Sequence, residues 1–258
     1  MASRRQLIAN IAALALVAPA LAACGEGRKL DQLAAGERGR VVEVRSGDVL
    51  VLDSGLVVRL VGLAAPRQGD AGFDQARAAL ASLAQGQMVA LYYGGARRDS
   101  YGRALAQVRR VKDQRWLQGE LLRAGWARVW TFADNRALAA AMLADESRAR
   151  AKAAGLWAMP AYKVLLPGEV GPQQHGFQIV EGRVLAVTEG RSGTFLDFSP
   201  DPAGFAVVIE PKDLATLRGG GVFPQQMANR LVRVRGVVGW GGVMTVDHPE
   251  QVEQLREP

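Results

Sequence analysis

VRLVGLAAP at residues 58–66 and RDSYGRALA at residues 98–106 are the two segments that decide the fold of this chain. Each one places an arginine at the end of a run of β-forming residues, Arg59 in the first segment and Arg103 in the second. The two segments therefore predict strands that carry cationic groups at their ends.

The sequence around these segments predicts a tight β meander followed by helices. The turn formers SGD at 46–48 and DSG at 53–55 separate three β-like runs, and apolar periodicity indicates the elements that follow. We expect strands at 40–45, 49–53, 57–63, 88–93 and 104–111, and helices at 73–83, 116–124 and 135–154.

The order of these motifs resembles the thermonuclease family, also called staphylococcal-nuclease-like. The resemblance joins SGD, the two arginine segments, and SRARAK at 147–152 with GLW at 155–157, and it covers about residues 39–157. The arginine after the Asp-x-Tyr-Gly turn is its most specific element. The resemblance implies a mainly β fold with helices (α+β), built on a five-stranded Greek-key barrel of the oligonucleotide-binding (OB) type.

The resemblance also implies roles for individual residues. Arg59 and Arg103 match the two guanidiniums that hold the scissile phosphate, whose planar forks suit phosphate oxygens and a transition state that gains negative charge. Asp48 matches the first calcium ligand, but Ala64 stands where a second aspartate is expected and Arg67 where the general-base glutamate is expected. Calcium takes about six to eight oxygen ligands, so one carboxylate makes a weak cage. These departures predict an anion site in place of a metal site, with calcium a doubtful cofactor.

Other interpretations of these residues stay open at the level of sequence. Asp70 lies three residues beyond Arg67 and Asp99 lies beside the second arginine, so both are candidates to replace the missing base, although neither occupies the expected position. Asp48 is equally compatible with the capping of a hairpin turn, Arg67 with a solvated loop, and Arg103 with pairing to a nearby carboxylate.

The first residues have the three parts of a secretory signal: a basic start, an apolar run and a small-residue exit. LAAC at 21–24 resembles the lipobox of bacterial lipoproteins, in which the cysteine is lipidated. Cys24 is the only cysteine, so it cannot form an internal disulfide. We expect an exported protein anchored in the membrane through lipidated Cys24 on the periplasmic face, with the outer membrane favoured because Gly25 is not acidic. A transmembrane helix and a processed, non-lipidated protein are the alternatives.

Composition divides the chain into five parts. We expect a signal peptide at 1–23, a lipidated tether at 24–36, a thermonuclease-like domain at 37–158, a linker rich in proline and glycine at 159–176, and an OB-like domain at 177–258. Loss of the signal, which holds two arginines and no acidic residue, lowers the formal charge from +7 to +5. That balance is compatible with nucleic acid or anionic lipid as a partner without selecting either.

The region after the linker predicts a second, smaller OB-like barrel. We expect strands at 177–187, 194–198, 205–210, 231–238 and 242–246, with a helix around 213–217. On the fourth strand Arg233 and Arg235 share a face, and with Phe195, Phe198 or Trp240 they could form a groove that follows a nucleic-acid backbone. The alternative is a solvated arginine face over an aromatic core.

Other catalytic patterns do not occur in the sequence. It has no His-Glu-x-x-His, paired cysteines, Gly-x-Ser-x-Gly or phosphate loop with lysine, and His175 and His248 are too isolated to indicate zinc. The leading hypothesis is a membrane-anchored, degenerate thermonuclease-like protein that binds nucleic acid or another phosphate-bearing ligand with weak or no hydrolysis. The alternatives are an active DNA or RNA endonuclease with a rewired site and a structural envelope scaffold.

Overall fold

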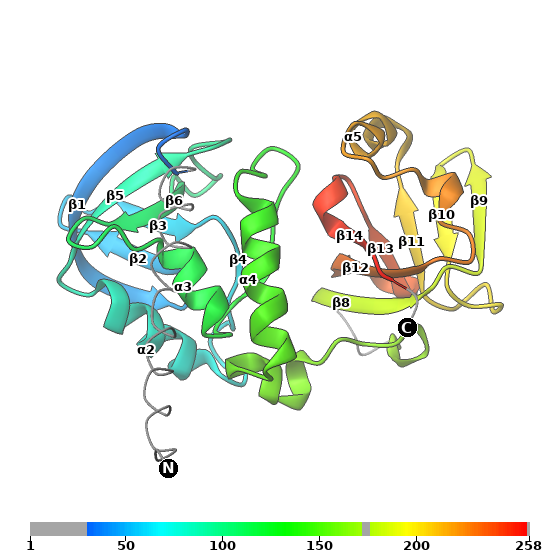
Figure 1. The fold of residues 1–258 in the computed structure, drawn as a ribbon, viewed down its shortest axis with the longest axis horizontal. Helices are drawn as coiled ribbons and strands as arrows, with labels where there is room; N and C mark the ends of the chain where they lie inside the picture. Colours follow the sequence, from blue (N-terminus) through cyan, green and yellow to red (C-terminus); the bar gives the residue numbers. More distant parts are fainter. Residues whose placement is uncertain (1–29, 172–175, 257–258) are drawn as a thin grey trace, which may run out of the picture.

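A computed structural model describes residues 30–171 and 176–256 of the chain. The expected signal sequence, Cys24 and His175 lie outside these residues. The described chain forms two β-rich parts, with helix α4 (Ala139–Ala151) on the side of the first part that faces the second (Figure 1). Within the described ranges, no helix is long and apolar enough to cross a membrane.

The first part is a closed barrel of five strands in the order β1-β2-β3-β6-β5, which confirms the expected barrel of the OB type. Strands β3 and β6 run parallel and the other neighbours run antiparallel. The strands are β1 (Ala34–Ser46), β2 (Val49–Leu52), β3 (Val57–Leu60), β5 (Met88–Tyr93) and β6 (Ala104–Arg110).

Strand β1 extends further than expected. It begins at Ala34, inside the predicted tether, because its first half pairs with β5 and its second half with β2. The residues 34–39 are small or charged and have no apolar alternation, so pairing with β5, rather than their own propensity, makes them a strand.

The run expected as one strand at 57–63 is two strands. Gly62 has φ +87°, a left-handed conformation that glycine adopts without a steric penalty. The chain therefore turns after β3 and continues as β4 (Gly62–Ala64), which pairs with β7 (Arg128–Trp130), a strand that the sequence did not predict. This small sheet moves Ala64 away from the barrel and opposite Arg128.

Helices cover the first barrel close to where they were expected. Helix α2 (Phe73–Ala84) buries Ala76, Leu80 and Ala84, which recur at helical spacing. Helix α3 (Leu117–Arg123) packs against both α2 and α4. Helix α4 is shorter than the predicted 135–154, because Leu138 before it has φ +65° and the helix begins only at Ala139.

The second part is a sheet of seven strands in which β9-β10-β11-β13-β12-β8 follow one another, with β14 also on β12. Strands β8 and β9 lie at the two ends of this path, and only residues 184–185 separate them in sequence. Strand β8 pairs with β12 and β9 pairs with β10, whereas in the first barrel the single strand β1 pairs with both of its neighbours. The parallel pair is β11 with β13, and helix α5 lies between β11 and β12, as in an OB fold.

The elements of this second part follow the predicted ones with three differences: the run 177–187 is two strands, and β14 and the short 3-10 helices were not predicted. Its elements are β8 (Gly176–Arg183), β9 (Ala186–Gly190), β10 (Gly193–Asp197), β11 (Ala206–Ile209), α5 (Leu214–Gly219), β12 (Leu231–Val238), β13 (Val243–Thr245) and β14 (Val252–Gln254).

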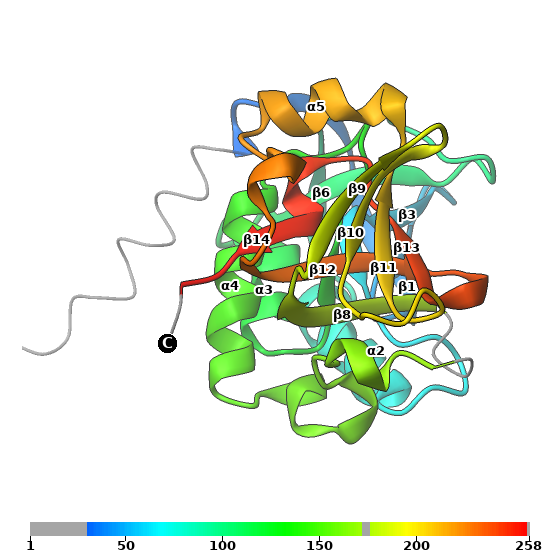
Figure 2. The same cartoon turned by 90° about the vertical axis from the view of Figure 1, so that its right-hand side faces the viewer.

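The two parts meet through buried ion pairs, and Figure 2 shows β12 and β8 crossing in front of α4 and α3. Arg235 of β12 is 1% exposed and donates to Glu146 of α4 at 3.1 Å and to Glu253 of β14 at 2.5 Å. Arg233 pairs with Glu181 and Glu253. Both sequence interpretations of these arginines are therefore wrong. They form neither a nucleic-acid groove nor a solvated face, because the first part of the molecule covers Arg235 and two carboxylates of the second part engage Arg233.

Candidate phosphate-binding site

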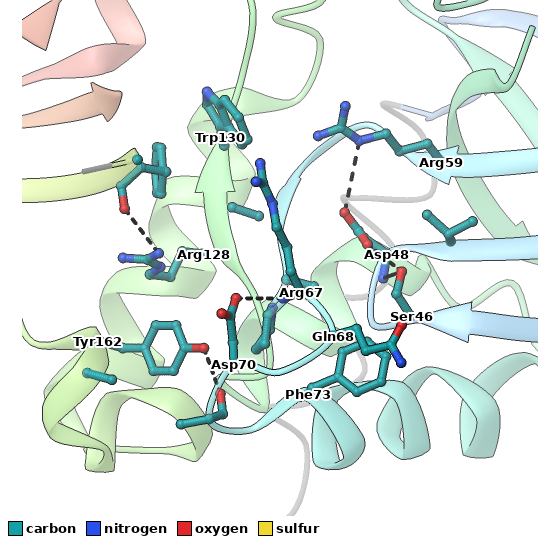
Figure 3. A pocket seen from close by; sticks show the side chains of 18 of the residues that line it. Ser46, Asp48, Arg59, Arg67, Gln68, Asp70, Phe73, Arg128, Trp130 and Tyr162 are labelled. Carbon is teal, nitrogen blue, oxygen red and sulfur yellow. Dashed lines mark hydrogen bonds and ion pairs between the residues drawn. The ribbon is translucent and has the colours of Figure 1, made fainter. Parts of the chain in front are cut away.

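A cavity of about 730 Å³ lies where the first barrel meets the beginning of the second part (Figure 3). Its walls come from the turn before β2, from β3, β7 and β8, from the loop after β4 and from the connector between the two parts. Five arginines and two aspartates line it, so it has an excess of positive charge; these are Arg45, Arg59, Arg67, Arg103, Arg128, Asp48 and Asp70. Of the first-domain positions that the sequence singled out, all but Asp99 line this cavity: Asp48, Arg59, Ala64, Arg67, Asp70 and Arg103.

The β3 backbone directs Arg59 out of the barrel. Val58 and Leu60 on either side are fully buried in the barrel core, and side chains alternate between the faces of a strand. The guanidinium lies 5.8 Å from the ring centre of Trp130 and 5.7 Å from that of Phe132. Its Nε is 3.9 Å from Asp48 Oδ2, so the aromatic rings and one carboxylate hold its position.

A turn built by Asp99 places Arg103. One oxygen of Asp99 accepts the backbone N–H groups of Tyr101 and Arg103, and the other accepts Arg103 Nε at 2.7 Å. Gly102 has φ +77°, which explains the glycine of the Asp-x-Tyr-Gly motif. Burial acts to raise the pKa of Asp99, but the hydrogen bonds from Arg103 and Tyr101 outweigh it and lower that pKa. Asp99 therefore positions Arg103 as a charged partner.

Asp48 faces both arginines from the turn between β1 and β2. Its Oδ1 accepts the Ser46 hydroxyl at 2.7 Å. A side chain at Gly47 would come within 2.9 Å of the Cβ atoms of Ala76 and Ala65, which explains the glycine between Ser46 and Asp48. Burial raises the pKa of Asp48, while the Ser46 hydrogen bond and the charges of Arg59 and Arg103 oppose the rise.

The two departures from the family pattern lie on the same cavity. Arg67 is exposed at the beginning of the loop after β4, and in the view of Figure 3 its side chain extends toward Trp130 between Arg128 and Arg59. Asp70 accepts the backbone N–H of Arg67 at 2.8 Å, so this carboxylate closes the loop in which Arg67 lies. A cation therefore occupies the position where the family resemblance implies a general base, and Asp70 is the cavity carboxylate nearest to it in sequence.

The residues at the expected calcium position do not fit that ion. Asp48 is the one carboxylate from the family pattern, and one of its oxygens already accepts Ser46. Position 64 is an alanine that lies directly opposite Arg128 in the β4–β7 pair. In the described part of the chain, no group of three acidic, histidine or cysteine residues could hold a metal ion. Calcium prefers a cage of oxygen ligands, and this cavity has arginines in its place.

Sequence reasoning missed Arg128, which enters the cavity from β7. Its guanidinium lies between two rings, 5.0 Å from the centre of Tyr162 and 4.9 Å from that of Phe177. Tyr162 comes from the connector and Phe177 from the second part, so the surroundings of Arg128 depend on residues far apart in sequence. A lone arginine in a short unpredicted strand gives no sequence signal of such a position.

Comparison with known proteins supports the assignment of the first domain. No curated protein matches the chain. The family model described as staphylococcal nuclease homologue matches residues 57–159, a range that contains Arg59, Ala64, Arg67 and Arg103 but begins after Asp48. Together with the closed barrel, this match identifies residues 57–159 as a staphylococcal nuclease homologue domain.

Proposed function

We propose that this protein binds a phosphate-bearing ligand, with nucleic acid as the first candidate, and hydrolyses it weakly or not at all. The observation that carries the proposal is the convergence of Arg59 and Arg103 on one cavity that has Arg67 at the position of the general base. Guanidinium forks suit phosphate oxygens and stay charged at physiological pH. Binding therefore needs only the groups that are present.

Hydrolysis needs groups that the cavity lacks. Attack on a phosphodiester requires a water molecule that loses a proton, and a base that accepts this proton typically contributes about 10²- to 10⁴-fold in rate. Arg67 cannot accept a proton because its guanidinium is already charged. Asp70 is the remaining candidate, but one of its oxygens is engaged by the backbone of Arg67.

The proposal is tested by measuring binding and cleavage in one experiment. The purified protein is incubated with single-stranded DNA and RNA, with calcium or with chelator, beside Arg59→Ala and the control Arg191→Ala. Arg191 is exposed on the turn between β9 and β10, outside the cavity lining, and its replacement removes the same charge. We expect binding that weakens with added salt, is lost in Arg59→Ala and persists in Arg191→Ala, without cleavage.

Other results would select the alternatives. Cleavage that requires calcium and disappears in Arg59→Ala would establish an active nuclease, and its loss in Asp70→Asn would assign the base to Asp70. Absence of both binding and cleavage would leave the scaffold hypothesis.

We also propose that the protein is exported and lipid-anchored at Cys24, which is supported by LAAC at 21–24 and by the absence of any other cysteine. Metabolic labelling with a radioactive fatty acid is expected to label the protein and not Cys24→Ser. Equal labelling of the two proteins would contradict the anchor.

A further inference from the structure

The guanidinium of Arg128 is buried and has no carboxylate within ion-pair distance among the described residues. The residue is 9% exposed, and its one hydrogen bond runs from Nη2 to the carbonyl of Phe177 at 3.3 Å. Its Nε is buried and has no hydrogen-bond partner. The charges of Glu146 and Asp70 act on Arg128 from beyond ion-pair distance, and the guanidinium lines the cavity. Buried charges in proteins are normally paired, so this arrangement indicates a missing anion.

The position opposite Arg128 explains why the anion is missing. Ala64 faces Arg128 directly across the β4–β7 pair, where opposed side chains lie on the same face of the sheet. An acidic residue at position 64 would be within reach of the guanidinium, and alanine leaves that space open to the cavity. Burial lowers the pKa of Arg128 to about 10, so the group still carries its charge at neutral pH.

Stacked rings separate Arg128 from the first pair of arginines. Trp130 stacks on Phe177 with ring centres 5.2 Å apart, and Arg59 lies at the Trp130 end of this pair while Arg128 lies at the Phe177 end. Arg67 reaches toward Trp130 from the loop below (Figure 3). One phosphate held between Arg59 and Arg103 would therefore leave Arg128 unneutralised.

We propose that Arg128, together with Arg67, forms a second anion subsite that takes another phosphate group of the same ligand. This inference rests on the proposed function and sharpens it. The ligand carries at least two linked phosphate groups, as in a single-stranded oligonucleotide or a polyphosphate chain. Its first phosphate lies at Arg59 and Arg103, and the next one lies at the junction of the two parts of the molecule.

The test compares ligands that differ in their number of phosphate groups. Affinities are measured calorimetrically for thymidylate and phosphorylated dithymidylate, and for inorganic phosphate and tripolyphosphate. We expect the wild-type protein to prefer the longer member of a pair, and Arg128→Met to reduce that preference about tenfold, the value of one charge-assisted hydrogen bond. Arg191→Ala is the matched control and keeps the preference. The pair that shows the larger preference distinguishes a nucleotide from a polyphosphate.

A second variant decides the matter if Arg128→Met does not fold. Ala64→Asp keeps Arg128 and supplies a carboxylate beside it. This carboxylate is expected to pair with Arg128 in place of the second phosphate, so the preference for the longer ligand is expected to disappear. If Arg59→Ala weakens binding but Arg128→Met and Ala64→Asp keep the full preference for two phosphates, the second subsite is refuted and the proposed function stands. If the wild-type protein binds none of the four ligands, the proposed function fails and the subsite with it.

Discussion

Arg128 and Arg235 are two buried arginines that differ in their ion-pair partners. Arg235 is 1% exposed and lies between Glu146 and Glu253. Arg128 is 9% exposed and lies between two aromatic rings, and within the described residues no carboxylate forms an ion pair with it. Each has a buried Nε without a partner. Arg235 donates to Val129, Glu146 and Glu253, whereas the one hydrogen bond of Arg128 within the described residues goes to the carbonyl of Phe177. The pair of Arg235 with Glu146 therefore joins the two parts of the molecule, whereas we propose that the partner of Arg128 is a ligand.

The largest effect is expected when Arg235 loses a counter-ion. Glu146 is 1% exposed and its side chain accepts Arg235, Arg150 and the backbone N–H of Val129. Glu146→Gln leaves a buried charge short of a partner, which is expected to lower the free energy of unfolding by about 3–5 kcal/mol. Urea denaturation measures this loss.

The matched control for that experiment is Asp74→Asn. Asp74 pairs with Arg77 at 3.2 Å on the solvent-exposed face of helix α2. Such surface pairs contribute about 0–1 kcal/mol to the free energy of unfolding. If Glu146→Gln loses no more unfolding free energy than the control does, the ion pairs of Arg235 do not stabilise the contact between the two parts.

The same substitution at both arginines sharpens the comparison. Arg235→Met leaves Glu146 and Glu253 without this partner and is expected to lower the free energy of unfolding by about 3 kcal/mol. Arg128→Met breaks no ion pair within the described residues, so the loss of its contacts with two rings is offset by removal of a desolvated charge. The change in unfolding free energy is expected to stay within about 1 kcal/mol. Equal destabilisation of the two variants in urea titrations would contradict the distinction.

Charge reversal at Arg67 tests whether the cavity acts as an anion site. Arg67→Glu is expected to lower the affinity for single-stranded DNA at least about tenfold, because a like charge then faces the phosphates. Since Arg67 is exposed, the effect is expected to shrink as ionic strength rises. Fluorescence anisotropy at two salt concentrations measures it beside Arg191→Glu, and an equal loss in that control would indicate only a dependence on net charge.

The smallest effect concerns Asp48, whose pKa is raised mainly by burial. An anion held by Arg59 and Arg103 disfavours the charged carboxylate further, so binding takes up a proton. The affinity for the anion is therefore expected to rise as the pH falls through the raised pKa of Asp48. The expected rise is about threefold, because protonation removes one negative charge that repels the anion. Sulfate is the suitable probe because it stays fully charged in this range.

The control for the pH experiment is Asp48→Asn. This variant is expected to bind sulfate at neutral pH as tightly as the wild-type protein does in acid. Its affinity is not expected to rise further as the pH falls. A rise that persists unchanged in Asp48→Asn would assign the proton to another group.

Most of the first barrel could be predicted from residue patterns, because its signals are local. The strand Met88–Tyr93 agrees with the predicted bounds, and Asp99, Gly102 and Arg103 form the turn that their motif indicates. The first half of β1 could not be predicted, since residues 34–39 become a strand only through pairing with β5. Strand β7 was missed for a similar reason: its three residues are held by β4 and by the contact with the second part.

By itself, the sequence determined the barrel and the positions of Arg59 and Arg103, because motif and spacing encode them. It also shows alanine at position 64 and arginine at position 67, where the family resemblance implies acidic residues. Only the tertiary structure decided which other arginines matter. The sequence around Arg128 gave no signal, and the pattern around Arg235 indicated a different role. Each acquires its role from residues that the fold brings to it from more than thirty positions away in the chain: Phe177 for Arg128 and Glu146 for Arg235. Whether a buried charge meets a carboxylate depends on packing, and local sequence does not contain that information.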